Sequence, residues 1–188
     1  GTVVAKQSIL LEHYSAIWLT PQMDRLFGEP ASGRRRFFDR LVCSWDTSHG
    51  NRLNSYNTAM RERLTLLRSY NDYNPNWLSA LENTMVECGV AITAARVDLL
   101  SRLGPIASEG IESFPSAELQ LLGGLELWLE NAPALDVEDR YRGMLKENRI
   151  KDGSIGRTHL GPHCTDLVVF HKLKGQPAKL CSTGEQKA

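Results

Sequence analysis

Apolar residues recur at steps of three and four along the middle of the chain. Between Leu78 and Leu99 the steps alternate over about three heptads, a pattern typical of a coiled-coil seam. A second stripe of helical period runs from Arg52 to Leu67, and the Asn/Pro-rich stretch NDYNPNW separates the two. The pattern predicts two helices that form an antiparallel hairpin. We expect the second helix to end at Leu103-Gly104-Pro105.

The segment before this hairpin predicts a strand and two helices. SAIWL at 15–19 is short, apolar and β-prone, and Thr20-Pro21 has the residue types that begin a helix. A helix capped by Ser32 is expected next, with Phe37, Leu41 and Cys43 on its apolar face. Arginines ring the rest of this helix, and they fit a solvated face or a functional basic patch equally well.

The second half of the chain mixes strand and helix signals. AELQLL and LELWL, on either side of Gly123-Gly124, fit strands or helical pieces. DVEDRYRGMLKENR predicts a helix with Asp136 at its start, followed by a buried strand DLVVF and a hairpin-like return, HKLKGQPAKL. Strands on either side of a helical insertion predict an α+β fold.

The charge of the chain is zero in total but uneven along its length. Residues 104–139 contain eight acidic residues and no Lys or Arg, whereas residues 140–188 contain ten basic residues and four acidic ones. The four cysteines show no paired spacing, which favours reduced thiols in a cytoplasm. No apolar run is long enough to span a membrane. Because the chain starts without Met and stops within a motif, we expect it to be part of a longer protein.

The closing stretch, CSTGEQKA, carries groups that bind phosphate. Ser182 and Thr183 offer hydroxyl groups and Gly184 an unshielded backbone N–H, while Glu185 and Gln186 favour a helix directly after them. A helix N-terminus favours an anion. An ordinary loop leading into a helix fits the same residues.

A metal site is the second candidate from the residues alone. His159, His163 and Cys164 lie close together in GRTHLGPHCTDL, and Cys181 could complete a zinc ligand set. Gly161-Pro162 disfavours the helix that would bring the two histidines together, so structural hydrogen bonds are the preferred interpretation and we expect no metal.

Four stretches in order resemble the RecF-type DNA replication and repair ATPases, relatives of the SMC and Rad50 proteins in the ABC ATPase group. They are WLTPQMDRLFGEPASGRRRFFDRLV, YNTAMRERLTLL, GRTHLGPHCTDL and CSTGEQKA. The resemblance implies part of an ABC-type P-loop ATPase lobe interrupted by a mainly helical insertion with an antiparallel helical hairpin. The implied division is 1–31 as the end of lobe I, 32–103 as the insertion, 104–150 as the mixed remainder of lobe II, and 151–188 as the return to the ATPase lobe.

The resemblance also implies a role for the closing loop. Two subunits would clamp ATP and Mg²⁺, with Ser182 donating its hydroxyl to the γ-phosphate and Gly184 its N–H. Cys181 and Thr183 would shape the loop, and Glu185 and Gln186 would start the helix behind it. Gln22 would sense Mg²⁺ and the attacking water. No G-x-x-x-x-G-K-[ST] loop and no strand ending in paired acids occur in the sequence. The resemblance implies that the intact protein is an ATPase. Because these motifs are missing from this chain, we expect the chain alone to be inactive and to bind no nucleotide.

DNA and protein partners complete what the resemblance implies. The family binds single- and double-stranded DNA at gaps and assists RecA loading with RecO and RecR, as an ATP-dependent homodimer in the cytoplasm. Basic side chains would contact DNA phosphates without reading bases; the candidates are Arg34, Arg35, Arg36, Lys172, Lys174 and Lys179. The alternative from another class is a non-enzymatic coiled-coil module that dimerises or recruits a partner through the helical hairpin.

Overall fold

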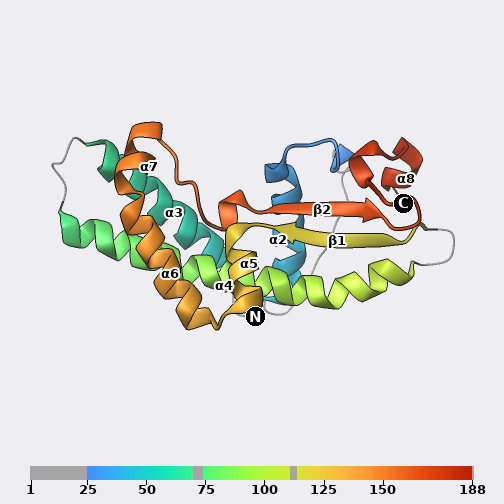
Figure 1. The fold of residues 1–188 in the computed structure, drawn as a ribbon, viewed down its shortest axis with the longest axis horizontal. Coiled ribbons are helices and arrows are strands. Elements are labelled where there is room, and N and C mark those ends of the chain that lie inside the picture. The colour runs from blue at the N-terminus through green and yellow to red at the C-terminus, as the bar shows by residue number, and fades with distance from the viewer. Residues whose placement is uncertain (1–24, 70–73, 111–113, 188) are drawn as a thin grey trace, which may run out of the picture. The chain divides into compact units, whose positions relative to one another are not determined.

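The elements of the structure, a computed structural model that describes residues 25–69, 74–110 and 114–187, are mainly helices with one small sheet (Figure 1). In order they are α2 (Ala31–Trp45), α3 (His49–Arg68), α4 (Pro75–Glu109), β1 (Ala117–Leu122), α5 (Gly124–Asn131), α6 (Ala134–Glu147), α7 (Arg149–Ile155), β2 (Asp166–His171), β3 (Gln176–Pro177) and α8 (Thr183–Lys187). Short 3₁₀ turns lie at Pro162–Cys164 and Ala178–Leu180. The expected strand at 15–19 and helix start at Thr20-Pro21 lie outside the described residues.

The described residues form two compact units, each built from segments far apart in the sequence. The first takes the chain up to His49, then Ala95–Leu122, then Asp166 onward; the second takes Gly50–Ala94 and Gly123–Thr165. Helix α4 contributes residues to both units. The expected boundaries at 31, 103 and 150 assign segments to the lobes of a larger protein, and they stay a prediction.

The sheet of the first unit is antiparallel and small. β1 pairs with β2, with Leu119 opposite Val169, and β3 adds two residues to the other edge of β2. Gly175, at φ 61°, closes the turn into β3. The strand at DLVVF and its hairpin return are therefore confirmed, although within β2 only Leu167 is buried and its neighbours are half-buried. AELQLL is a strand and LELWL belongs to helix α5, which resolves the two alternatives that the sequence left open.

Helix α2 packs on this sheet by a face one residue away from the expected one. Phe38 and Val42 are the buried residues, and they join Leu99 and Leu167 in a small core. The prediction of Phe37, Leu41 and Cys43 as the apolar face was off by one residue: these three are half-buried, with Leu41 packed against the small core and Phe37 lining the pocket beside it.

The expected N-cap of α2 was also misplaced. The helix begins at Ala31 after Pro30, with no side-chain cap, so Ser32 lies inside its first turn. The backbone N–H of Gly33 donates to the Pro30 carbonyl at 2.9 Å, so the turn is closed by backbone groups. The Ser32 hydroxyl is consequently not needed there.

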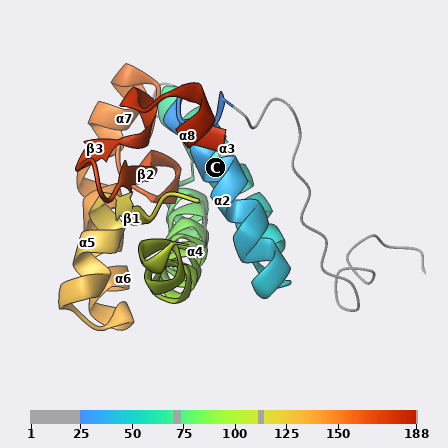
Figure 2. The same ribbon diagram turned by 90° about the vertical axis from the view of Figure 1, so that its right-hand side faces the viewer.

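Asp39 fastens α2 to its neighbours in the first unit, where α2 crosses α4 at an angle (Figure 2). Arg96 donates to both Asp39 carboxylate oxygens, at 2.8 and 2.9 Å, and the ring of fully buried His49 lies 2.9 Å away. Burial would raise the pKa of Asp39, but the hydrogen bonds with His49 and Arg96 outweigh it and hold that pKa below its ordinary value. Asp39 is thus charged at neutral pH and joins three helices.

Helix α4 runs past the expected stop. It includes Pro105 and ends at Glu109, where Gly110 takes φ 73°. The prediction of an end at Gly104-Pro105 was wrong, because a proline inside a helix costs one backbone hydrogen bond without necessarily ending the helix. Gly110 supplies the left-handed residue with which helices commonly stop.

Helices α3 and α4 form the expected antiparallel hairpin in the second unit. Arg63 of α3 pairs with Glu82 of α4, and Tyr56, two turns earlier in α3, lies against Gly89, two turns later in α4. Five residues of the predicted seam are buried, Leu78, Leu81, Met85, Ile92 and Leu99, whereas Cys88 and Ala95 are half-buried. Leu99 belongs to the core of the first unit, and Leu81, Met85 and Ile92 belong to the core of the second. Residues of α5 and α6 complete this hydrophobic core; they are Leu125, Val137, Tyr141 and Leu145.

A fully buried arginine lies within this hairpin. Arg63 donates to Glu82 at 3.0 Å, to Asp152 at 2.8 Å and to the Leu145 carbonyl at 2.7 Å, with a fourth bond to the Thr158 hydroxyl at 3.2 Å. Figure 1 shows the helices that these bonds connect, α3, α4, α6 and α7. The guanidinium group thereby fixes how the helices of this unit pack.

At the other end of the same unit, Gly161-Pro162-His163, called the GPH block below, contributes its histidine to an aromatic cluster. The Tyr56 hydroxyl lies 2.8 Å from His163 Nδ1 and 3.1 Å from the Tyr141 hydroxyl. His163 Nε2 lies 2.9 Å from the Thr158 carbonyl; because a carbonyl only accepts, this nitrogen carries the proton. Gly161, at φ 143°, lies so close that a Cβ would overlap both tyrosine hydroxyls.

We predict that Gly161→Ala destabilises the protein by at least about 1–3 kcal/mol, because it adds backbone strain and a steric overlap. Gly143→Ala is the matched control, since Gly143 is exposed within α6 and a Cβ there meets nothing within 4 Å. The control should be stabilised by about 0.4–1 kcal/mol. Urea unfolding of both variants measures the difference, and equal stability of the two would contradict the packing described.

Candidate functional site

The closing loop is ordered by a capping box. The Ser182 hydroxyl and backbone N–H both donate to Glu185 Oε2, at 2.8 and 3.0 Å, and the Glu185 N–H donates back to the Ser182 hydroxyl at 3.4 Å. Such a reciprocal pair satisfies the open N–H groups at the start of a helix. Ser182, Thr183 and Gly184 remain exposed, and a Cβ on Gly184 would meet nothing within 4 Å. The loop thus presents its hydroxyl groups and one glycine N–H on the surface.

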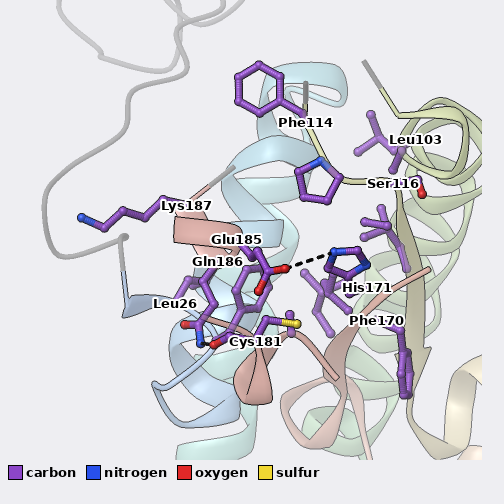
Figure 3. A pocket seen from close by; sticks show the side chains of 18 of the residues that line it. Leu26, Leu103, Phe114, Ser116, Phe170, His171, Cys181, Glu185, Gln186 and Lys187 are labelled. Carbon is purple, nitrogen blue, oxygen red and sulfur yellow. Dashed lines mark hydrogen bonds and ion pairs between the residues drawn. The ribbon is translucent and has the colours of Figure 1, made fainter. Parts of the chain in front are cut away.

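Two residues from the β2–β3 hairpin hold Glu185 from the other side. The Lys174 ammonium group donates to Glu185 Oε1. His171 Nε2 lies 3.6 Å from the same oxygen, as Figure 3 shows. The bond from Lys174, followed by those from Ser182, lowers the pKa of Glu185 to about 2. The same contact with Glu185 raises the pKa of Lys174. At neutral pH the loop is therefore held by a charged carboxylate.

The loop borders an apolar pocket of about 640 Å³ in the first unit. Leu26, Phe37, Leu103 and Phe114 are among its lining residues, and Glu185, Gln186 and Lys187 lie at the loop side (Figure 3). Gln186 donates to the Cys181 carbonyl at 2.8 Å, which ties α8 to the residue before the loop. The lining is mostly hydrocarbon, so the pocket suits an apolar surface better than a phosphate, which the exposed loop can accept.

The predicted DNA-binding residues fall into two groups in the structure. Arg34 is mostly buried and forms a two-pronged pair with Asp166, with both distances 2.8 Å, which raises the pKa of Arg34. Lys174 holds Glu185, and Lys172 bonds the Ser108 hydroxyl and carbonyl. Arg36 and Lys179 are exposed, and Arg35 is half-buried. Gln22 lies outside the described residues.

The candidate zinc ligands make hydrogen bonds in the structure. His159 Nδ1 lies 2.9 Å from Asp152, and the Cys164 thiol lies 3.3 Å from both the His159 carbonyl and His163 Nε2. Among the residues that the structure describes, no group of three or more His, Cys, Asp or Glu side chains is placed to hold a metal. The same part of the chain has no helix with the length and apolarity needed to cross a bilayer.

Sequence reasoning missed His171 and Lys174 as neighbours of the loop. The two residues lie on the strand and turn before it, and only the pairing of β2 with β3 brings them to Glu185. The sequence signal was the S-x-x-E pattern of Ser182 and Glu185, which is typical of a capping box. This pattern in the closing motif indicates that the loop is ordered. It does not indicate that His171 and Lys174 contact Glu185.

The fold matches that of recombination mediator proteins. A solved structure of the recombination mediator protein RecF with ATPrS, in the RecFOR pathway, aligns with 98% of this chain and 50% of its own at a TM-score of 0.82 and 18% identity. A structure of RecF with ATP aligns with 90% of this chain and 46% of its own at a TM-score of 0.74 and 19% identity. At this identity the likeness shows the fold.

Sequence similarity identifies the family. The chain is 46% identical over its whole length to the DNA replication and repair protein RecF of Rhizobium rhizogenes (strain K84 / ATCC BAA-868), and 45% identical to that of Mesorhizobium japonicum (strain LMG 29417 / CECT 9101 / MAFF 303099). It spans about half the length of these curated relatives, 50% in each case. No family model matches the chain. By this similarity the chain belongs to the RecF family.

We predict that Lys174→Ala raises the pKa of Glu185 from about 2 toward its ordinary value of 4.5, because the largest stabilisation of the carboxylate is removed. A carboxyl ¹³C NMR titration measures it. Because the pKa of Glu185 is lowered in the folded loop, the bracing contact is complete above pH 4.5 and disappears as the pH falls through about 2.

Lys172→Ala is the matched control for this titration, since Lys172 lies in the same turn but bonds Ser108. It should leave the pKa of Glu185 unchanged. If Lys174→Ala and Lys172→Ala gave the same Glu185 titration curve as the unmodified protein, the bracing role of Lys174 would be wrong.

Proposed function

We propose that this chain serves in a RecF-like DNA repair and recombination ATPase, in which its closing loop contacts the γ-phosphate of an ATP held by a second subunit. The exposed loop carries the proposal: Ser182 and Gly184 lie on the surface, and the box with Glu185 and Lys174 orders the backbone that presents them. The Ser182 hydroxyl, which donates to Glu185 in this structure, would turn to the phosphate, and an ordered loop loses little conformational entropy when it binds an anion. ATP bound there would supply the phosphate that joins the two subunits.

The residues fit one face of such a nucleotide site. Ser182 and Thr183 offer hydroxyl groups, Gly184 a bare N–H, and Lys187 an exposed ammonium group, all of which suit a polyphosphate. Glu185 and Gln186 hold the turn behind them. The Walker A lysine and Walker B acids are not part of this sequence, so we propose that they come from the rest of the full-length ATPase, with Mg²⁺. Gln22 remains the proposed residue for sensing Mg²⁺ and the attacking water.

The same proposal includes DNA. The full-length protein binds gapped single- and double-stranded DNA and assists RecA loading together with RecO and RecR in the cytoplasm. Arg36 and Lys179 are exposed and suit phosphate contact, whereas Arg34 and Lys174 already neutralise carboxylates of this chain. Arg35 and Lys172 complete the proposed basic set. The first unit corresponds in this proposal to the ATPase lobe, and the second to its helical insertion.

The coiled-coil alternative receives no support from the second unit. The seam residues Leu81, Met85 and Ile92 of α4 are covered by residues of this chain, among them Leu125, Val137 and Leu145. A stripe already buried inside the unit cannot also pack against a second chain without unfolding part of it.

We predict that Ser182→Arg in the full-length protein abolishes ATP-dependent dimerisation, because a bulky cation replaces the donor that meets the phosphate. Light scattering after size-exclusion chromatography, with and without a slowly hydrolysed ATP analogue, measures the dimer. Ser154→Arg is the matched control, since Ser154 is exposed on α7, away from the loop in sequence and in a different unit. It should dimerise like the unmodified protein. An ATP-dependent dimer of Ser182→Arg would refute the role of the loop.

A further inference from the structure

A second pocket lies in the second unit, where α3 meets the segment that follows α7. It has a volume of about 430 Å³, and Met60 and Leu64 of α3 provide its apolar part. The other side is formed by Gly156 to His159 and by the GPH block. None of its lining residues is acidic.

Two arginines at this pocket have unused donors. Arg61 donates through Nε to the Asn57 carbonyl at 3.1 Å, and Arg157 through Nε to His159 Nε2 at 3.4 Å. Within the described residues, the terminal nitrogens of both guanidinium groups have no hydrogen-bond partner, and both side chains are exposed. The Nε contacts orient the two groups while their paired N–H donors stay available.

The imidazoles of the pocket are held from behind. His159 lies against Asp152, which is itself fixed by the buried guanidinium of Arg63. His163 is fixed between the Tyr56 hydroxyl and the Thr158 carbonyl. Asp152, the carboxylate that His159 contacts, is buried and is satisfied by Arg63 and His159. The wall is therefore rigid, and the exposed charges that face the pocket are positive.

We propose that this pocket binds a phosphodiester group of a nucleic-acid backbone, with Arg61 and Arg157 as the phosphate ligands. Guanidinium groups match the geometry of phosphate oxygens with two parallel hydrogen bonds. Met60 and Leu64 offer an apolar surface for the sugar beside the phosphate. This inference rests on the proposed function, since it adds a contact in the second unit to a protein proposed to bind DNA through its first.

The first test is the salt dependence of duplex DNA binding by the full-length protein, followed by fluorescence anisotropy. Arg61→Ala/Arg157→Ala should weaken binding several-fold and make the slope of log K against log salt shallower by about 2, one unit for each phosphate that is no longer neutralised. Lys146→Ala/Lys151→Ala is the matched control, because it removes two exposed charges of the same unit outside the pocket. It should leave the slope unchanged.

The second test uses the exposed Cys164 thiol, which lines the pocket, as a reporter. Duplex DNA should slow its alkylation by N-ethylmaleimide several-fold, measured peptide by peptide by mass spectrometry, with Cys43 as the internal reference. If the unmodified protein binds DNA but Cys164 reacts at the same rate and both double variants bind alike, the pocket assignment is overturned and the proposed function stands. If the unmodified protein binds no DNA, both fail.

Discussion

The buried guanidinium group of Arg63 is the constraint on which the packing of the second unit depends. A charge removed from water is tolerated only where it is paired and hydrogen-bonded. Arg63 donates four bonds, to two carboxylates, one hydroxyl and one carbonyl, from three helices and the segment after α7. Arg149 adds a second cation on Glu82, so two arginines balance two acids. Helices α3, α4, α6 and α7 must therefore pack together around this guanidinium group.

Many residues of the motifs that carry the family resemblance form ion pairs and hydrogen bonds that connect elements of the structure. In R-R-R-F-F-D, Arg34 pairs with Asp166, the last residue of the G-P-H-C-T-D block, and Asp39 holds Arg96 and His49. In the same block His163 supports the aromatic cluster of Tyr56 and Tyr141. Removing one member of such a pair leaves its partner charge uncompensated. The exposed chemistry lies in two other stretches of the resemblance, at the closing loop and at Arg61, and at Arg157.

The pattern of apolar residues predicted the parts of the fold in which apolar side chains pack, such as most of the seam of α4 and the strand DLVVF. It failed where polar groups decide the outcome. The sequence does not single out Arg63 as buried, since nothing local shows that Glu82 and Asp152 converge on it. The capping of the loop was readable from Ser182 and Glu185, because that pattern is local. Its bracing by Lys174 and His171 was not, because it needs the pairing of β2 with β3.

The most direct test is the free energy of unfolding of Arg63→Leu, compared with Arg61→Leu on the exposed face of the same helix. The structure predicts that Arg63→Leu lowers the free energy of unfolding by about 3–5 kcal/mol, because Glu82 and Asp152 stay buried with part of their charge uncompensated. Arg61→Leu should change the stability by no more than about 0.5 kcal/mol. Equal unfolding free energies for the two variants would contradict the central role of the buried arginine.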